Sequence, residues 1–327
     1  MDNNGYTPAP LTSRSGRSPS AVDTIDVSVI IPVRNGMPYL PEQLAALARQ
    51  TYRGRWEVII SDNGSVDESL DAVRAASDSI PLRIVDSRGA PGAAGARVAA
   101  AKVARGQLLL FCDADDVIAD DWVEQMSKAL DQYAAVGGHI DDASLNSEAV
   151  QSWRPPSTPG QLQRPFGLMS FAGAGNCGFR RAVYDQAGGF DVHAGDAAAE
   201  IELCWQVQLD GYELAYVPTA VVAYRHVADL RSLMRQHRNY GKAQPHVVAR
   251  YQSLGLLPPG SWRDAAATLA WFAVHAINLV RGTWRRGDYL RMLAFVVGQV
   301  QGSIENRVLY VTIKPPRGIR NTETSGV

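Results

Sequence analysis

The most constraining feature of this sequence is an alternation of short apolar runs with helical patterns in its first 135 residues. Four runs rich in β-branched residues recur about every 25–30 residues: Val27–Val33, Trp56–Ser61, Leu82–Asp86 and Gln107–Cys112. Strands that alternate with helices at this period form βαβ units with helices on both faces of the sheet. The sequence therefore predicts an α/β fold with a mostly parallel central sheet.

The segments between the runs have the apolar spacing of helices. The expected stripes are Leu40, Leu44 and Leu47 after Pro38 and Pro41; Val66, Leu70 and Val73; the alanine-rich Gly95–Arg105; and Trp122, Met126, Leu130 and Tyr133. Asp120 is expected as the N-cap of the last of these helices. After Val136 the alternation ends, and shorter strands are expected at Ala174–Phe179, Leu214–Val217 and Ala220–Tyr224, the last two joined by a turn at Pro218–Thr219.

Polar side chains follow each of the four runs. They are Arg34 and Asn35 after the first, Asp62 and Asn63 after the second, Arg88 after the third, and Asp113 and Asp115 after the fourth. In open α/β sheets, ligands bind beyond the carboxyl ends of the strands. Turn chemistry explains one or two such residues but not four sets in succession. The pattern therefore predicts a binding site at this edge of the sheet.

Asp113-Ala114-Asp115 is the most informative of these segments. At a strand end, residues i and i+2 project to the same side, so two carboxylates lie close together and repel each other unless a divalent cation is bound beside them. Oxygen ligands of this kind suit Mg²⁺ or Mn²⁺ held jointly with the phosphates of a substrate. The structural alternative is an N-cap cluster for the helix that begins near Asp120.

Four runs in the same order resemble the family 2 glycosyltransferases of GT-A fold: VSVIIPVRNG, VIISDNGSVDES, RVAAAKVARGQLLLFCDADD and GGFD with EIELCWQVQLDGYELAYVPTAVVAYRH. The resemblance covers roughly residues 26–240. It implies inverting transfer of a sugar from a nucleotide-sugar donor. It also implies donor binding by Pro32, Arg34, Asn35, Asp62, Asn63, Arg97, Asp113 and Ala114, and Mn²⁺ or Mg²⁺ binding by Asp113, Asp115 and His226.

The catalytic base of the family lies in an acidic pair that reads Ala199-Glu200 in this chain. The resemblance therefore implies Glu200 as the base, with Asp196 and Glu202 as alternatives. Gln206 stands where the family usually has an arginine, and in the family's Ala-Arg-Asn segment this chain has Ala96 and Arg97 but Val98 in place of the asparagine. The Gln-x-x-Arg-Trp motif of processive synthases is absent from the sequence, which favours transfer of one sugar per encounter.

Other classes of protein fit less well. A dinucleotide-dependent oxidoreductase needs GxGxxG directly after the first strand, where this chain has Pro32-Val33-Arg34-Asn35-Gly36. A sugar-1-phosphate nucleotidyltransferase needs a glycine-rich basic loop there and stays an alternative, as does a catalytically silent nucleotide-sugar-binding module. We expect a UDP-sugar donor, with dTDP- and GDP-sugars as alternatives. The expected acceptor is a hydroxyl of a glycan, a lipid-linked glycan or a small molecule, used in cell-envelope polysaccharide, glycolipid or glycoconjugate synthesis and bound near Trp153–Gly175.

The expected organisation has a flexible tail at 1–25, a catalytic domain at 26–240, a basic helical extension at 241–320 and a tail at 321–327. Within the domain, 26–135 would bind the nucleotide sugar and 136–240 the acceptor. The net charge is −1 overall, but residues 225–320 hold 15 Lys and Arg against 4 Asp and Glu. This asymmetry predicts that the extension faces an anionic membrane surface, with a homodimer contact as the alternative. Nucleic acid is not expected as a partner.

The remaining sequence features indicate where the chain works. The first 25 residues lack the apolar core of a signal peptide, and no apolar run reaches the roughly 20 residues of a membrane span. The three cysteines, Cys112, Cys177 and Cys204, fit neither a disulfide framework nor a zinc site. We therefore expect a cytoplasmic protein that lies peripherally on the inner face of the cell membrane.

Overall fold

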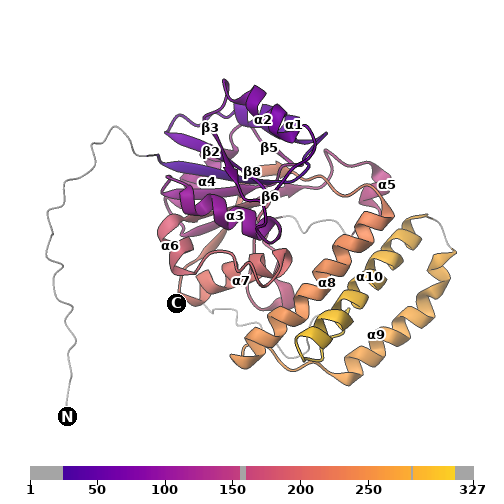
Figure 1. Cartoon of the computed structure of the whole chain (residues 1–327). Helices are drawn as coiled ribbons and strands as arrows, with labels where there is room; N and C mark the ends of the chain where they lie inside the picture. The colour runs from indigo at the N-terminus through magenta and orange to yellow at the C-terminus, as the bar shows by residue number, and fades with distance from the viewer. Residues whose placement is uncertain (1–24, 155–159, 281–282, 314–327) are drawn as a thin grey trace, which may run out of the picture.

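A computed structural model describes residues 25–154, 160–280 and 283–313. It contains one eight-stranded mixed sheet of order β3-β2-β1-β4-β7-β6-β8-β5. The strands are β1 Val27–Val33, β2 Trp56–Asp62, β3 Leu82–Asp86, β4 Leu108–Cys112, β5 Val117–Ile118, β6 Ala135–Asp141, β7 Asn176–Arg180 and β8 Leu214–Ala223. The predicted α/β class is confirmed, and helices lie on both sides of the sheet (Figure 1).

The helices cover the sheet and then extend beyond it. They are α1 Leu40–Ala48, α2 Ser69–Ala76, α3 Gly92–Val103, α4 Trp122–Leu130, α5 Glu148–Gln151, α6 Arg181–Gln186, α7 Asp196–Leu209, α8 Leu230–Ser253, α9 Trp262–His275 and α10 Thr283–Glu305, with short 3₁₀ turns at Pro165–Gly167 and Ala276–Leu279. Helices α8, α10 and α9 lie side by side next to the sheet domain, with α9 outermost (Figure 1).

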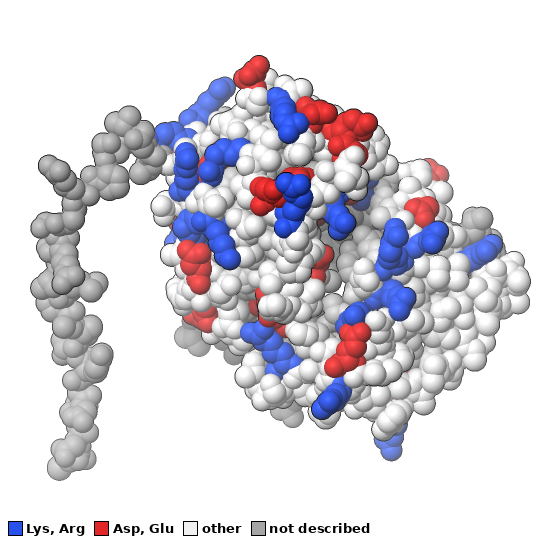
Figure 2. Space-filling model, in the orientation of Figure 1, with Lys and Arg blue, Asp and Glu red and all other residues white. Residues whose placement is uncertain are grey.

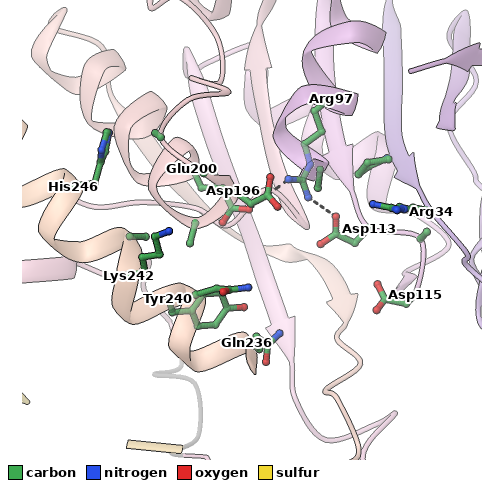
Figure 3. Close-up of a pocket in the computed structure, with 18 of the residues that line it drawn as sticks. Arg34, Arg97, Asp113, Asp115, Asp196, Glu200, Gln236, Tyr240, Lys242 and His246 are labelled. Carbon is green, nitrogen blue, oxygen red and sulfur yellow. Dashed lines mark hydrogen bonds and ion pairs between the residues drawn. The ribbon is translucent and has the colours of Figure 1, made fainter. Parts of the chain in front are cut away.

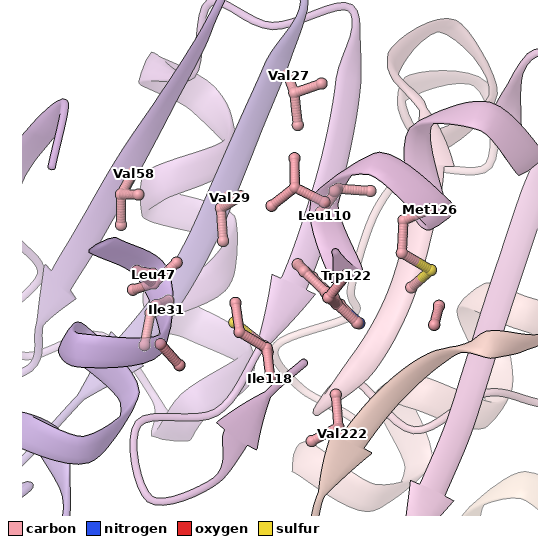
Figure 4. Packing of buried hydrophobic residues seen from close by; sticks show 14 of the residues in the cluster. Val27, Val29, Ile31, Leu47, Val58, Leu110, Ile118, Trp122, Met126 and Val222 are labelled. Carbon is pink, nitrogen blue, oxygen red and sulfur yellow. The ribbon is translucent and has the colours of Figure 1, made fainter. Parts of the chain in front are cut away.

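Strand β1 shows how the sequence alternation builds the two cores. Val29 and Ile31 point into one apolar cluster together with Leu47 of α1, while Ile30 points into the cluster on the opposite face with Ala100 of α3. Figure 4 shows the first cluster, in which side chains of α4 pack on the sheet. Burial on both faces explains why the parallel strands read as nearly continuous apolar runs.

The second half of the sheet differs from the prediction. The expected pair of strands around Pro218–Thr219 is instead the single strand β8, whose pairing with β6 shifts register between Gly138 and His139. Pro218 has no N–H to donate to a ladder, so the chain bulges there without turning back. The side chain of Asn176 donates to the carbonyls of His139 and Ala220, and it holds the bulge in place.

Two details of the predicted helices are wrong. Val66 is 91% exposed and precedes α2, because its N–H donates to the Asn35 side chain and the helix begins only at Ser69. Asp120 does not cap α4: its carboxylate pairs with Arg49 at 3.0 Å, and Asp121 occupies the N-cap position without a side-chain cap bond.

Helix α8 begins before the expected helical extension at 241–320 and runs through the expected domain boundary at residue 240. It packs on α7 through apolar contacts, where the rings of Trp205 and Tyr251 lie 4.7 Å apart in an edge-to-face arrangement. It also contacts α10 backbone to backbone, since a Cβ atom at Gly241 would lie 1.9 Å from the Phe295 carbonyl oxygen. The C-terminal helices are therefore continuous with the second half of the catalytic domain.

Among the residues that the structure describes, no helix is both long enough and apolar enough to cross a membrane.

Candidate functional site

A cavity of about 1020 Å³ opens at the carboxyl ends of β1 and β4. It is lined on one side by the loops after these strands and by α3 and α7, and on the other side by α8 and α10. The surface is hollowed between the sheet domain and these two helices (Figure 2). The sequence predicted the first side of this cavity but not the second.

The loop after β1 contributes Pro32, Arg34 and Asn35 to the cavity wall. Asn35 has a φ of 54°, the left-handed region that asparagine tolerates better than most residues. Its N–H donates to Ser65 Oγ, and its Oδ1 accepts from the N–H of Val66. These hydrogen bonds join the loops after β1 and β2, so the backbone next to Arg34 is held in place.

Asp62 and Asn63 shape the neighbouring loop and are not among the residues that line the cavity. The Asp62 carboxylate is buried and accepts from the N–H groups of Gly64 and Ser65. Asn63 Nδ2 donates to the carbonyls of Ala90 and Gly92, which lead into α3. Both side chains are therefore engaged in loop structure, and their predicted contact with a donor stays a prediction.

Arg97 is the electrostatic centre of the cavity (Figure 3). It is 2% exposed, and its guanidinium lies 2.5 Å from Asp113 Oδ1 and 3.6 Å from Glu200 Oε1. Burial alone would lower the pKa of Arg97, but the two carboxylates outweigh burial and raise it, so the side chain stays cationic. Arg97 is thereby placed between the predicted metal ligand and the predicted base.

Asp113, Ala114 and Asp115 all line the cavity, as the strand-end spacing predicts. Next to them, sequence reasoning missed Asp116, which is 1% exposed; one of its oxygens accepts from the Arg225 N–H and the other has no partner among the described residues. Burial, with Asp113 as the next cause, raises the pKa of Asp115 to about 6, and it raises that of Asp116 as well. Three carboxyl groups thus lie close together at this corner, of which Asp116 is buried and Asp115 is exposed.

The donor set fits a divalent cation. Two carboxylates that face an open cavity are what Mg²⁺ or Mn²⁺ uses when substrate phosphates complete its coordination. The buried Asp116 beside them has one oxygen with no partner among the described residues. Within the described ranges, no group of three or more His, Cys, Asp or Glu side chains lies close enough to hold a metal without such phosphates.

His226 is not brought to this corner. Its Nε2 lies 3.2 Å from Asp142 Oδ1, its ring packs on Tyr224, and it is not among the residues that line the cavity. The sequence placed His226 just past a strand end, which is correct, but the strand turns it toward Asp142. Its predicted metal contact is therefore without support from this geometry.

The three candidate bases, all on α7, differ in where their carboxylates lie. Glu200 faces the cavity, and burial, opposed by Arg97, raises its pKa to about 7. Asp196 also lines the cavity, but its Oδ1 accepts from the Ala94 N–H at the start of α3. Glu202 lies on the other side of the helix and pairs with Arg250 at 2.9 Å. Of the three, Glu200 has the carboxylate best suited to accept a proton near pH 7.

The wall formed by α8 and α10 was missed altogether. The expected acceptor segment, Trp153–Gly175, contributes none of its described residues to the cavity, and residues 155–159 lie outside the described ranges. The side chains of α8 that line the cavity are instead Gln236, Asn239, Tyr240, Lys242, Ala243 and His246. Their three- and four-residue spacing was a readable signal of one polar helix face.

The sheet order, the strand-end site and the acidic corner together define a nucleotide-sugar transferase of GT-A type. Residues 28–188, just under half of the chain, match the model of glycosyl transferase family 2, and this match together with relatives named glycosyltransferases identifies the chain as a transferase. It is 26% identical over 211 residues to the uncharacterized glycosyltransferase YwdF of Bacillus subtilis, a match that covers 61% of this chain and 73% of YwdF. It is 28% identical over 257 residues to the pre-mycofactocin glycosyltransferase of Mycobacterium tuberculosis, covering 72% of this chain but only half of that protein.

Solved structures show the same fold. The mannosyltransferase PcManGT of Pyrobaculum calidifontis, in complex with GDP-Man and Mn²⁺, superimposes with a TM-score of 0.57 at 19% identity, covering 88% of this chain and 90% of that one. The TarS 1-349 fragment of S. aureus, in complex with UDP, gives 0.53 at 16% identity, covering 88% of this chain and 93% of the fragment. These matches confirm the predicted GT-A architecture.

Proposed function

We propose that this chain transfers one sugar from a nucleotide-diphosphate sugar to a hydroxyl acceptor, with inversion and with the help of a divalent cation. The observation that carries the proposal is the line of side chains across the cavity. Asp113 lies 2.5 Å from Arg97, and Arg97 lies 3.6 Å from Glu200 on the opposite side. One cavity thus contains a cation that can stabilise the charge of a departing diphosphate and a carboxylate that can accept the proton of the acceptor hydroxyl.

In this mechanism each residue has a separate role. Asp113 and Asp115 would hold Mn²⁺ or Mg²⁺, which would supply charge stabilisation for the diphosphate. Arg97 donates hydrogen bonds to the diphosphate oxygens as negative charge grows on them. Glu200 accepts the proton of the attacking hydroxyl, and a carboxylate with a pKa of about 7 is well matched to that task near neutral pH. A single inverting displacement needs no protein nucleophile.

We further propose that the donor is a UDP-sugar, with dTDP- and GDP-sugars as the alternatives. TarS is solved with UDP and PcManGT with GDP-Man, so the fold accommodates either nucleotide in those proteins. The test is a donor panel: release of the nucleoside diphosphate is measured with Mn²⁺, with Mg²⁺ and with EDTA. We expect metal-dependent hydrolysis of one class of donor. Hydrolysis that is unchanged in excess EDTA would count against the metal.

The same panel separates the alternative functions. Ala199 and Gln206 depart from the family pattern, which favours a silent binding module. Such a module would bind a donor, seen as a thermal shift, without releasing the diphosphate. A sugar-1-phosphate nucleotidyltransferase would instead release pyrophosphate from a nucleoside triphosphate and a sugar 1-phosphate. We expect donor hydrolysis and no pyrophosphate release.

We also propose that the enzyme works in the cytoplasm, on the inner face of the membrane, and that α9 makes the contact. This helix packs on α10 through Phe272, Tyr289 and Val296, and its other face is exposed. The exposed side chains there are mostly apolar and include Trp262, which is 79% exposed; Val280, just after the 3₁₀ turn that follows the helix, is 81% exposed. The other large exposed apolar side chains are Leu269 and Val274 on α9 and Ile277 and Leu279 on the 3₁₀ turn. An apolar helix face of this kind, with a tryptophan at its end, suits the headgroup region of a bilayer.

Charge favours a membrane over a second copy of the chain. The surface over α9 in Figure 2 is almost free of charged side chains, while the exposed Arg263 lies at the start of α9 and the exposed Arg286 lies near the start of α10. A two-fold symmetric contact through this face would bring the arginines of both copies together. An anionic leaflet attracts them instead, by about 1 kcal/mol for each basic residue near its surface.

Co-sedimentation with vesicles decides between these partners. Wild-type protein is expected to pellet with vesicles of phosphatidylcholine and phosphatidylglycerol, and to do so far less with phosphatidylcholine alone. The triple variant Trp262→Ser, Leu269→Gln, Val274→Gln should stay in the supernatant, whereas Val103→Gln, at an exposed apolar position on α3, should pellet like wild type. Negligible binding to both vesicles together with a stable dimer in solution would favour the homodimer.

A further inference from the structure

We infer that the cavity wall formed by α8 and α10 is the acceptor subsite, and that it takes an uncharged, hydroxyl-rich group, a sugar ring, next to Glu200. The inference rests on the proposed transferase function and specifies the substrate class of the same cavity. Its residues lie outside the segment that matches the family model, which ends at residue 188. They are Gln236, Asn239, Tyr240, Lys242, His246 and Asn306.

The first support is position. The cavity is one space: strand-end residues such as Arg34 and Asp115 line one side, and α8 lines the other. Figure 3 shows Gln236, Tyr240, Lys242 and His246 on α8 facing the site from the side opposite Arg34 and Asp115, with Glu200 and Asp196 between the two sides. A donor whose diphosphate lies at the acidic corner leaves this second wall for the acceptor. The base would then lie between the two substrates.

The second support is charge. Lys242 is the single lysine or arginine among the described residues of this wall, and its Nζ lies 2.9 Å from Glu305. The wall therefore offers an acceptor no free cation that would pair with a phosphate or a carboxylate. The neighbouring Asp196 and Glu200 would repel an anionic group as well. A phosphate at the attacking end of the acceptor is disfavoured on both counts.

The third support is the hydrogen-bonding inventory. The amides of Gln236 and Asn239 and the phenol of Tyr240 line the wall, and amides both donate and accept. Asn306 and His246 also line it, but their side chains bond to each other and to Gly302 and Glu202. Sugar hydroxyls also donate and accept, so they match such groups better than an acyl chain does. Tyr240 adds a partly exposed ring, an apolar surface with a polar tip, close to the acidic pair on α7 (Figure 3).

The fourth support is rigidity, because a subsite must be held in place by its surroundings. His246 is fixed from two sides: its Nδ1 lies 3.2 Å from Asn306 Oδ1 and its Nε2 lies 3.4 Å from Glu202 Oε1. Beneath the wall, α8 and α10 are in backbone contact, and a Cβ atom at Gly298 would lie 2.0 Å from the Arg238 carbonyl oxygen. The polar side chains are thus carried on two locked helices.

The test uses small acceptors in place of the unidentified natural one. With the donor that the panel selects, transfer is measured to para-nitrophenyl glycosides of glucose, galactose, mannose and N-acetylglucosamine. The competing probes are glucose 1-phosphate and ribitol 5-phosphate. We expect transfer to at least one neutral glycoside and none to the phosphorylated probes. Donor hydrolysis without transfer to any neutral glycoside, or a preference for the phosphorylated probes, overturns the inference.

Variants then locate the subsite. Asn239→Ala and Tyr240→Ala should each raise the KM for the glycoside about tenfold, the equivalent of one or two lost hydrogen bonds or a lost ring contact. The affinity for UDP, measured by calorimetry, should stay the same in both. Tyr240→Phe keeps the ring and should have the smaller effect. Arg235→Ala is the matched control, since Arg235 is exposed on α8 and does not line the cavity.

The outcomes separate this inference from the proposed function. If wild-type protein neither binds nor hydrolyses any nucleotide sugar, the transferase proposal fails first. If the donor is bound and hydrolysed normally but the α8 variants behave like Arg235→Ala, the acceptor lies elsewhere and only the subsite is refuted.

Discussion

Replacing Glu200 by glutamine tests the base and its environment with one change. Glutamine has nearly the same shape but cannot accept a proton, so kcat should fall by about 10²–10⁴. The affinity for the donor should change little, because Arg97 keeps its 2.5 Å contact with Asp113. The kcat/KM of the wild type should fall as the pH drops below about 7, since the carboxylate is then protonated. The residual activity of Glu200→Gln should not show this fall at low pH.

The same substitution should stabilise the folded protein, and the size of this stabilisation follows from the pKa of Glu200. Burial, opposed by Arg97, raises the pKa of Glu200 from 4.5 to about 7. One pH unit corresponds to about 1.4 kcal/mol, so the ionised carboxylate costs the folded state about 3 kcal/mol. The side chain is 21% exposed, so most of this cost should be felt. Glutamine removes the cost.

The sign follows from proton linkage. Between pH 4.5 and 7 the folded protein keeps the Glu200 proton while the unfolded chain has lost it. The free energy of unfolding of the wild type therefore falls with rising pH through this window, relative to the variant. The difference between Glu200→Gln and wild type should grow by about 3 kcal/mol from pH 4.5 to pH 7 and then level off.

Urea unfolding at several pH values, in EDTA, measures this difference. The neighbouring Asp115 and Asp116 titrate in both proteins and cancel in the comparison. A constant difference across the pH range would mean that Glu200 ionises like an ordinary surface carboxylate, and the assignment of the base would lose its physical basis. A large loss of kcat in Asp196→Asn, with little in Glu200→Gln, would place the base at Asp196 instead.

Two further changes test the metal corner and the helix contact. Asp115→Ala should abolish transfer at all concentrations of Mn²⁺ while the thermal unfolding midpoint stays near that of wild type; retained activity would contradict the metal role. Gly298→Ala should lower the free energy of unfolding by about 1–3 kcal/mol, because the added methyl group collides with the Arg238 carbonyl oxygen. Urea unfolding of that variant checks the value, and an unchanged midpoint would mean that α8 and α10 separate easily.

The parallel half of the sheet could be predicted from sequence because each of its strands is buried on both faces. Such a strand reads as a continuous apolar run, and the polar residues after it mark the ligand edge. Strand β6 could not be predicted, because Gly137 and Gly138 interrupt its apolar pattern. A Cβ atom at Gly138 would lie 2.2 Å from the Ala220 carbonyl oxygen, so the close pairing with β8 requires the glycine. That requirement is tertiary and leaves no local signal.

The position of Asp113 and Asp115 could be predicted from the sequence, whereas the cavity wall formed by α8 and α10 could not, because that wall also depends on tertiary contacts. Asp113 and Asp115 belong to a local motif, whose spacing alone places both side chains on one side of the chain. His226 is local to a strand end too, but its direction depends on the contact with Asp142, which is distant in sequence. The polar face of α8 carries a periodic signal, yet it faces the cavity because of tertiary packing, such as that of Trp205 against Tyr251.

Helix α7 contacts both the Arg97 side of the cavity and helix α8. Residues two positions apart on an α-helix point about 200° away from each other, so Glu200 and Glu202 face opposite sides. Glu200 reaches the cavity beside Arg97, and Glu202 reaches Arg250 and His246 on α8. The family's pattern departs at Ala199 and Gln206, and neither position lies in the cavity: Ala199 is buried in the sheet core and Gln206 donates to Asp210. These departures therefore leave Glu200, the proposed base, in place, and α7 couples its position to that of the wall formed by α8 and α10.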